Sequence, residues 1–138
     1  MEEFIRRYGG EPYIINKDFG VPVLKDEIEI AVNNTGAKIV FLVHGETSSG
    51  LLQPLEEIGE YCSKNNILFL VDCATTIGCI PFYMNKWHVN GMFTVSQKSL
   101  ACSPGLSILA IDSKYLEYSK SVQAFPGFYF DINLLLSS

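Results

Sequence analysis

Two short apolar strings of nearly the same composition limit most strongly what this chain can fold into. Residues 39–43 read IVFLV and residues 67–71 read ILFLV. Runs of this length, rich in β-branched and aromatic residues, are typical of strands buried on both faces of a parallel sheet. Parallel neighbours need a crossover connection, which is normally right-handed and helical. The pair therefore predicts an α/β fold.

The segment between the two strings has the pattern of the crossover helix. Residues 54–65 begin with a proline, which suits the first turn of a helix. Within them, Leu55, Ile58 and Cys62 fall on one face at helical spacing. A strand–helix–strand unit is therefore expected over residues 39–71.

A second helix is predicted upstream, over residues 25–34. Gly36 follows it and suits a left-handed C-terminal cap. Residues 13–15 (YII) predict another short strand before it. The buried stripe of this helix is expected to comprise Leu24, Ile28, Ala31 and Val32.

Downstream, residues 92–95 (MFTV) predict a third strand. The next apolar run, residues 106–111, follows too soon for a helical crossover, so it is expected to lie antiparallel after a turn through 103–105. Residues 114–121 predict a further helix, and nothing in the apolar tail, 125–136, predicts a cap or turn. The fold class is α/β, with a mostly parallel sheet and one antiparallel strand at about residues 106–111.

Composition excludes several classes of protein. A net charge of −5 argues against a nucleic-acid surface, which needs a basic face, and no apolar run approaches the ~18 residues of a membrane span. Neither end has the pattern of a targeting signal. The cysteines lack the spacing of a metal site or a disulfide framework and are expected to be buried or half-buried free thiols in a reducing compartment. They are Cys62, Cys73, Cys79 and Cys102.

Polar residues follow three of the predicted strands. They are residues 44–50 (HGETSSG), Asp72, and residues 96–98 (SQK). Ligands of open parallel sheets bind beyond the carboxyl ends of the strands, so the three groups are expected to face one crevice. Each has a simpler interpretation as well: Asp72 as a helix cap, Lys98 as a solvated charge, the segment 46–50 as a polar turn. His44 is expected to make a buried hydrogen bond.

Three longer strings carry a resemblance to a known family. Residues 43–55 (VHGETSSGLLQPL), 70–74 (LVDCA) and 96–100 (SQKSL) resemble the alanine–glyoxylate / serine–pyruvate aminotransferases, class V of the pyridoxal-phosphate enzymes. Residues 81–84 (PFYM) and 104–105 are also similar to that family. The resemblance implies a fold-type-I large domain, pyridoxal 5'-phosphate as cofactor, an amino acid and a 2-oxo acid as substrates, and a homodimer. It also implies a peroxisomal, mitochondrial or cytoplasmic location.

The same resemblance implies roles for five residues. Lys98 matches the Schiff-base lysine, and Asp72 matches the carboxylate that binds the protonated pyridine nitrogen. Thr47 matches a hydroxyl that bonds the phenolic oxygen of the cofactor, and Gln97 a ligand of its phosphate. Ala74 matches a small residue packed on one face of the ring. Because a Schiff-base lysine must be partly deprotonated, this role requires Lys98 to lie buried in a crevice.

The chain departs from the family pattern in places. Residues 47–49 read Thr-Ser-Ser where Ser-Ser-Thr is commoner, Cys73 stands where serine is usual, and residues 102–104 replace a proline pair. The glycine-rich phosphate loop of the family is expected before Met1 and its small domain after Ser138. Residues 1–138 are therefore expected to be the central part of a cofactor-binding large domain.

Alternatives to an alanine or serine transaminase remain open. Insect 3-hydroxykynurenine transaminases share the same strings. Cysteine desulfurases share the fold but usually have a histidine before the lysine, where this chain has Gln97, and need a catalytic thiol on a mobile loop. A truncated, non-catalytic remnant is the third alternative.

Overall fold

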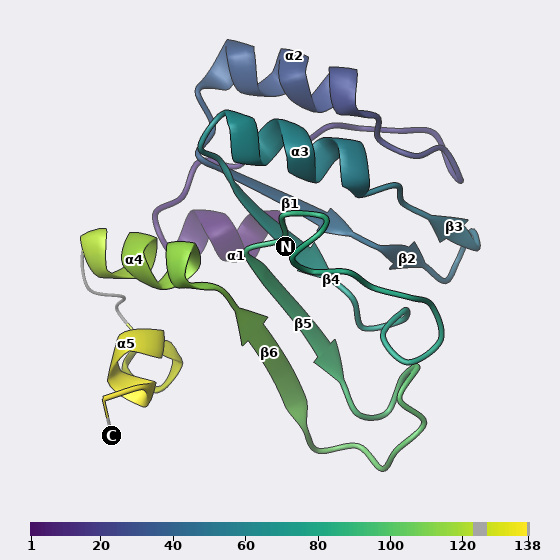
Figure 1. The fold of residues 1–138 in the computed structure, drawn as a ribbon, viewed down its shortest axis with the longest axis vertical. Helices are drawn as coiled ribbons and strands as arrows, with labels where there is room; N and C mark the ends of the chain where they lie inside the picture. The colour runs from purple at the N-terminus through teal and green to yellow at the C-terminus, as the bar shows by residue number, and fades with distance from the viewer. Residues whose placement is uncertain (123–126, 138) are drawn as a thin grey trace.

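A four-stranded sheet forms the centre of the computed structural model, which describes residues 1–122 and 127–137 (of Tyr129, the backbone only). Figure 1 shows helices packed along the sheet. In chain order the elements are α1 Glu2–Arg7, α2 Lys25–Thr35, β1 Ile39–Val43, β2 Gly45–Glu46, β3 Leu51–Leu52, α3 Glu56–Lys64, β4 Leu68–Asp72, β5 Gly91–Val95, β6 Ser107–Ile111, α4 Ser113–Ser121, η1 Phe128–Phe130 and α5 Ile132–Leu135. The sheet has the order β1-β4-β5-β6, and β2 and β3 form a separate two-stranded hairpin.

The predicted strand directions are confirmed. β1 pairs parallel with β4, β4 pairs parallel with β5, and β6 pairs antiparallel with β5. β4 begins at Leu68 and includes Asp72, one residue later at each end than predicted. The α/β class with one antiparallel strand therefore follows the sequence pattern.

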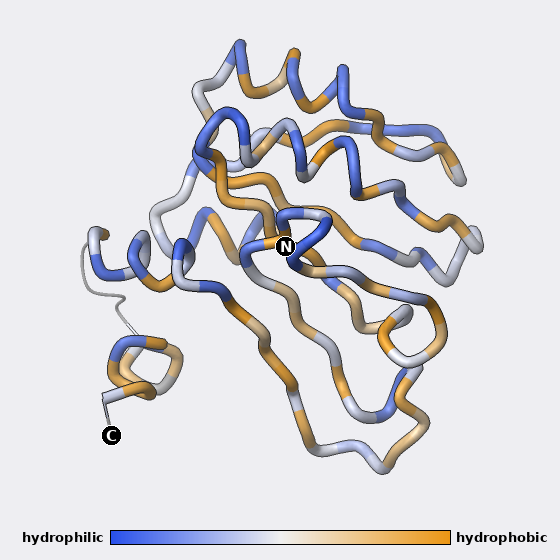
Figure 2. Tube along the Cα trace, viewed as in Figure 1, coloured by the Kyte–Doolittle hydropathy of each residue, from blue (hydrophilic) through white to orange (hydrophobic). Residues whose placement is uncertain are grey.

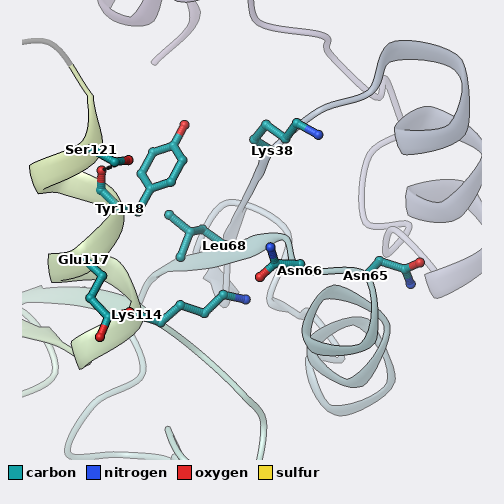
Figure 3. Close-up of a pocket in the computed structure, with 8 residues that line it drawn as sticks. All are labelled: Lys38, Asn65, Asn66, Leu68, Lys114, Glu117, Tyr118 and Ser121. Atoms are coloured by element: carbon teal, nitrogen blue, oxygen red, sulfur yellow. Dashed lines mark hydrogen bonds between the residues drawn. The ribbon is translucent and has the colours of Figure 1, made fainter.

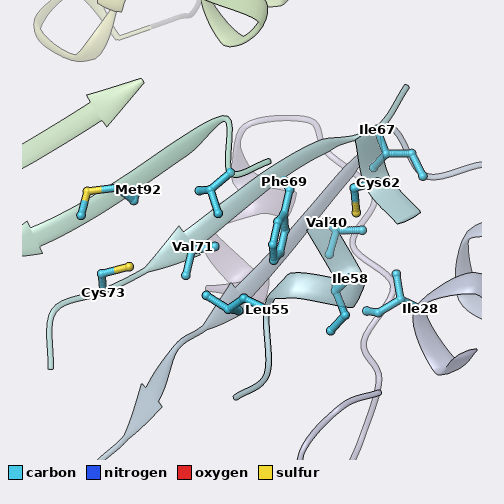
Figure 4. Close-up of a cluster of buried hydrophobic side chains, with 11 residues drawn as sticks. Ile28, Val40, Leu55, Ile58, Cys62, Ile67, Phe69, Val71, Cys73 and Met92 are labelled. Carbon is cyan, nitrogen blue, oxygen red and sulfur yellow. The ribbon is translucent and has the colours of Figure 1, made fainter. Parts of the chain in front are cut away.

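One face of the sheet is covered by α2 and α3 and holds the core (Figures 1 and 4). In Figure 2 the strands are hydrophobic, whereas α2 and α3 alternate between hydrophobic and hydrophilic residues. We call this side of the sheet the covered face. Its buried cluster comprises Ile28, Val40, Leu55, Ile58, Cys62, Ile67, Phe69, Val71, Cys73, Val89 and Met92. The predicted stripe of α3 is thus confirmed in full.

The opposite face, which we call the open face, is only partly covered. A row of residues in register crosses all four strands near their shared edge: Val43 of β1, Asp72 of β4, Phe93 of β5 and Leu109 of β6. Val43 is 40% exposed and Leu109 is 56% exposed. At the other end of this face α4 approaches the sheet, because Tyr115 lies beside Gly91. Asp72 is the one polar member of an apolar, half-exposed row.

Several predicted boundaries need correction. Residues 13–15 form no strand in the described part of the chain, and Tyr13 and Ile14 are exposed there. Leu24 does not belong to the buried stripe, because it is the N-cap residue of α2 and 54% exposed. The helix predicted from residue 54 begins at Glu56, with Leu55 as its N-cap residue. The left-handed stop at Gly36 is confirmed by its φ of 67°.

The tail also differs from expectation. Its first two residues, 125 and 126, lie outside the described residues. Further along, the Asp131 carboxylate accepts a hydrogen bond from the Asn133 amide and caps α5. No helix in the described part of the chain is long and apolar enough to cross a membrane.

Candidate functional site

Three segments leave the carboxyl ends of the parallel strands at one edge of the sheet. We call them the β1 loop (44–50), the β4 loop (73–80) and the β5 turn (96–102). Val43 is in register with Asp72, and Asp72 is in register with Phe93. β1 and β4 therefore end together, and β5 extends beyond them at the same edge, to Val95. The expected convergence of the three polar segments at one edge is therefore present.

The β4 loop holds the β1 loop through two threonines. The Thr75 hydroxyl donates a hydrogen bond of 2.6 Å to the Gly45 carbonyl oxygen. The Thr76 hydroxyl lies 2.9 Å from Nδ1 of His44, a residue that is 2% exposed. The prediction that His44 makes a buried hydrogen bond is thus confirmed. Sequence reasoning missed Thr75 and Thr76 because two threonines after a strand carry no pattern that identifies their partners.

Burial also sets the charge of His44. Its ring packs beside Phe82 and Trp87, at centroid distances of 5.7 and 5.9 Å. Removal from water penalises the imidazolium and lowers the pKa of His44 below its usual value. A neutral imidazole therefore belongs to the framework of the site.

The β1 loop contains β2 and the turn of the β2–β3 hairpin, and Thr47 lies in that turn. The Glu46 carboxylate accepts hydrogen bonds from the amide and the hydroxyl of Ser48, at 2.9 and 2.8 Å. The hydrogen bond from the Ser48 amide is the larger cause of the lowered pKa of Glu46. Thr47 itself is exposed. The sequence interpretation of 46–50 as a polar turn is therefore correct for its local structure.

Asp72 ends β4, and its side chain is half-buried. Its Oδ1 atom accepts a hydrogen bond of 2.9 Å from the amide of Ala74, which is also half-buried. This bond forms a local turn of the capping kind and fixes the orientation of the carboxylate. No ion pair of Asp72 occurs within residues 1–122 and 127–137. The carboxylate is thus oriented by the backbone rather than by a cationic side chain.

The β5 turn presents Gln97 and Lys98. It closes through hydrogen bonds from the Ala101 amide to the Lys98 carbonyl, at 2.9 Å, and from the Cys102 amide to the Ser96 carbonyl, at 3.0 Å. Gln97 and Lys98 are both exposed, so the expected burial of Lys98 is wrong for this chain. The reason is that the described chain packs nothing over the tip of this turn. Lys98 forms no ion pair in the described segments.

Two cavities lie at the opposite edge of the sheet. The larger, about 400 Å³, lies between the starts of β1 and β4 and the helix α4, with Lys38, Leu68 and Lys114 in its wall (Figure 3). The smaller, about 260 Å³, lies near Asn90 and Asp112. Neither contains a residue that the sequence predicts for the site.

The model of one protein family matches most of this chain. It is the family described as aminotransferase class-V, and it matches residues 14–131. The chain belongs to the class-V aminotransferase family. The family resemblance and the fold class predicted from the sequence are therefore confirmed.

Individual class-V aminotransferases are similar over nearly the whole chain. The alanine–glyoxylate aminotransferase of Mus musculus is 34% identical over 135 residues, which are 96% of this chain and 32% of the mouse protein. The crystal structure of alanine–glyoxylate aminotransferase from Nostoc sp. matches with a TM-score of 0.92 at 35% identity, over 98% of this chain and 36% of that one. The ureidoglycine–glyoxylate aminotransferase of Bacillus subtilis matches with a TM-score of 0.91 at 28% identity, over 98% and 35%. This chain thus spans about a third of the length of these class-V relatives.

Proposed function

We propose that residues 1–138 form the central part of the cofactor-binding large domain of a pyridoxal-phosphate-dependent aminotransferase. The reaction would transfer the amino group of a small amino acid, such as alanine or serine, to glyoxylate or pyruvate. The names of the similar mouse, Nostoc and Bacillus proteins support glyoxylate as the acceptor. One observation carries the proposal. Asp72 is the last residue of β4, which lies between β1 and β5, and the turn that carries Lys98 begins at the same edge of the sheet.

The residues present fit this cofactor. When bound, pyridoxal phosphate supplies an electron sink, provided that its ring nitrogen holds a proton. A carboxylate about 4 Å from that nitrogen contributes roughly 4 kcal/mol at an effective dielectric constant of 20. Asp72 suits this role because the Ala74 amide already orients it and apolar neighbours surround it in the row. Ala74 would offer a small surface to the ring.

The other three residues would act from the flanking segments. Lys98 would supply the amine that binds the cofactor aldehyde, because its turn begins at the same edge of the sheet as Asp72 and its amine forms no ion pair within the described residues. The burial that this role requires would have to come from packing that residues 1–122 and 127–137 do not provide. Gln97, beside it, would bind the phosphate, and Thr47 on the hairpin would bind the phenolic oxygen. In a longer chain we expect this unit to work as a homodimer, as the family resemblance implies.

Covalent trapping tests the proposal. The purified chain is mixed with pyridoxal phosphate, scanned for Schiff-base absorbance, reduced with borohydride and digested with trypsin. We expect the reduced adduct at Lys98, and its loss in Lys98→Ala. Lys114→Ala is the matched control and should retain the adduct. A label at Lys114 or Lys120, or equal labelling of the Lys98→Ala variant, would contradict the assignment.

A further inference from the structure

Two exposed thiols flank the β5 turn. Cys79, in the β4 loop, and Cys102, at the end of the β5 turn, are both exposed and free, so the expectation that the cysteines are buried or half-buried is wrong for these two. The Cys79 thiol donates to the carbonyl oxygen of Ser99 at 3.7 Å, and the Cys102 thiol donates to the carbonyl oxygen of Leu100 at 3.2 Å. The two thiols therefore contact consecutive carbonyl groups of one turn.

The backbone holds the two segments against each other. Gly78 has a φ of 96°, and a Cβ atom there would lie 3.2 Å from the Ser99 carbonyl oxygen and 3.2 Å from the Leu100 side chain. The β4 loop thus approaches the β5 turn closely just before Cys79. Within the β5 turn, the Cys102 amide donates a hydrogen bond to the Ser96 carbonyl oxygen. Both cysteines are attached to fixed backbone rather than to free ends.

The other two cysteines differ sharply from this pair. Cys62 and Cys73 are fully buried in the covered face. Burial raises the pKa of each of these thiols to about 12. Since the thiolate is the nucleophile in thiol chemistry, buried thiols of this kind are inert. The chain therefore separates its thiols into an accessible outer pair and a buried, unreactive inner pair.

We propose that Cys79 and Cys102 form a reversible disulfide that ties the β4 loop to the β5 turn. The oxidant is a small disulfide such as oxidised glutathione. One cysteine thiolate attacks a glutathione sulfur and releases one glutathione thiol, which leaves a mixed disulfide. The second cysteine thiolate then attacks the protein sulfur of that mixed disulfide and releases the second glutathione thiol. Two protein thiols are oxidised, and one glutathione disulfide is reduced to two thiols.

The bond would constrain the residues between its ends. A disulfide requires Cα atoms within about 7 Å, so closure fixes the spacing of Cys79 and Cys102. Lys98 lies in the turn that this bond would anchor. A consequence for cofactor chemistry rests on the proposed function, whereas formation of the disulfide does not. Oxidation would then restrict the movement that Lys98 needs to reach a cofactor aldehyde.

Peptide mapping tests the disulfide itself. The native chain is incubated with oxidised glutathione, alkylated, and digested with trypsin without reduction. We expect peptide 65–86 joined to peptide 99–114, with fragmentation placing the bond on Cys79 rather than Cys73. The chain should run as a monomer on a non-reducing gel and lose the cross-link on reduction. Cys79→Ser and Cys102→Ser should each abolish it and leave one glutathione on the remaining exposed thiol.

Other outcomes would overturn the proposal. Stable glutathione adducts on both Cys79 and Cys102, or a bond between two chains, would mean that the thiols cannot meet. Equal alkylation of all four cysteines under native conditions would contradict the division into outer and inner pairs.

A second measurement separates this inference from the proposed function. Borohydride trapping of pyridoxal phosphate is compared in the reduced and oxidised chains, and we expect several-fold slower trapping at Lys98 after oxidation. Cys79→Ser should trap equally in both conditions. Absence of trapping in both forms counts against the proposed function and leaves the cross-link result intact. Equal trapping rates in a chain shown to be cross-linked would refute the effect on Lys98.

Discussion

The covered and open faces of the sheet use the same strands for different purposes. On the covered face, Phe69 and Val71 are fully buried under α2 and α3. On the open face, the register row places Asp72 between apolar neighbours that remain partly exposed. Along β4, side chains that stabilise the core therefore alternate with side chains of the open face, which include the candidate site residue Asp72, because successive side chains of a strand point to opposite faces. Substitutions can test this division directly.

The largest difference is expected between two phenylalanines. Phe69→Ala should lower the free energy of unfolding by about 3–5 kcal/mol, since it opens a cavity in the covered face. Phe93→Ala, on the half-buried open face, should cost about 1–2 kcal/mol, because less packing is lost. Urea unfolding followed by circular dichroism measures both. Equal costs would show that the open face is a second core.

A pair of aspartates sharpens the comparison between structural and chemical carboxylates. Asp112 caps α4 through the Tyr115 amide and accepts a bond from the Asn90 side chain at 2.7 Å. Asp112→Ala should lower the free energy of unfolding by about 2–3 kcal/mol, because α4 loses its cap and the buried side-chain amide of Asn90 is left without its acceptor. Asp72→Asn should change stability by less than about 0.5 kcal/mol, since an asparagine can still accept from the Ala74 amide. The same variant should nevertheless weaken cofactor binding.

The pH dependence of stability tests the contribution of His44, which is buried just after the end of β1. His44 is neutral when folded and has a lowered pKa, so the unfolded state binds its proton more readily. Its contribution is fully present above the unfolded value near 6.5 and is lost as the pH falls below it. Melting temperatures between pH 7.5 and 5 should therefore decline less in His44→Asn than in the parent. His88→Asn, at an exposed histidine, should follow the parent.

The smallest effect on stability is expected at the edge of the open face. Leu109 is exposed on β6, a strand with one unpaired edge in the described sheet. Exposed apolar edge strands promote association between chains. Leu109→Lys should leave the free energy of unfolding nearly unchanged and reduce self-association in sedimentation experiments. Unchanged association would place the contact between chains elsewhere.

Sequence reasoning succeeded where periodicity was long and failed where it was short. The strands at 39–43 and 107–111 were predictable from continuous apolar runs, the second within one residue of its start. The stripe of α3 was predictable because burial on one face imposes helical spacing on its apolar residues. The two-residue strands β2 and β3 and the six-residue helix α1 were missed, because so few residues carry no period. Residues 13–15 look like a strand by composition, but no described strand pairs with them.

The candidate site was predictable to a different depth. The shared edge of the three polar segments followed from strand direction alone. The exposure of Lys98 did not, because burial of a turn depends on what packs over it. The threonine bonds that join the β4 loop to the β1 loop depend on side-chain geometry between residues some thirty positions apart. The roles of Thr47, Asp72, Ala74, Gln97 and Lys98 stay predictions.

The antiparallel direction of β6 has a consequence for where a chain of this fold can accept insertions during evolution. Because β6 returns alongside β5, the segment joining them also lies at the carboxyl edge. The Ser96 hydroxyl donates to the Ser103 carbonyl and accepts from the Leu106 amide, so it closes the base of this segment. Pro104 and Gly105 lie between these two partners of Ser96, and a Cβ atom on Gly105 would meet no atom within 4 Å. Insertions between them would lengthen the segment at the edge that also carries Lys98 without shifting any strand, so this is where variation in length is best tolerated.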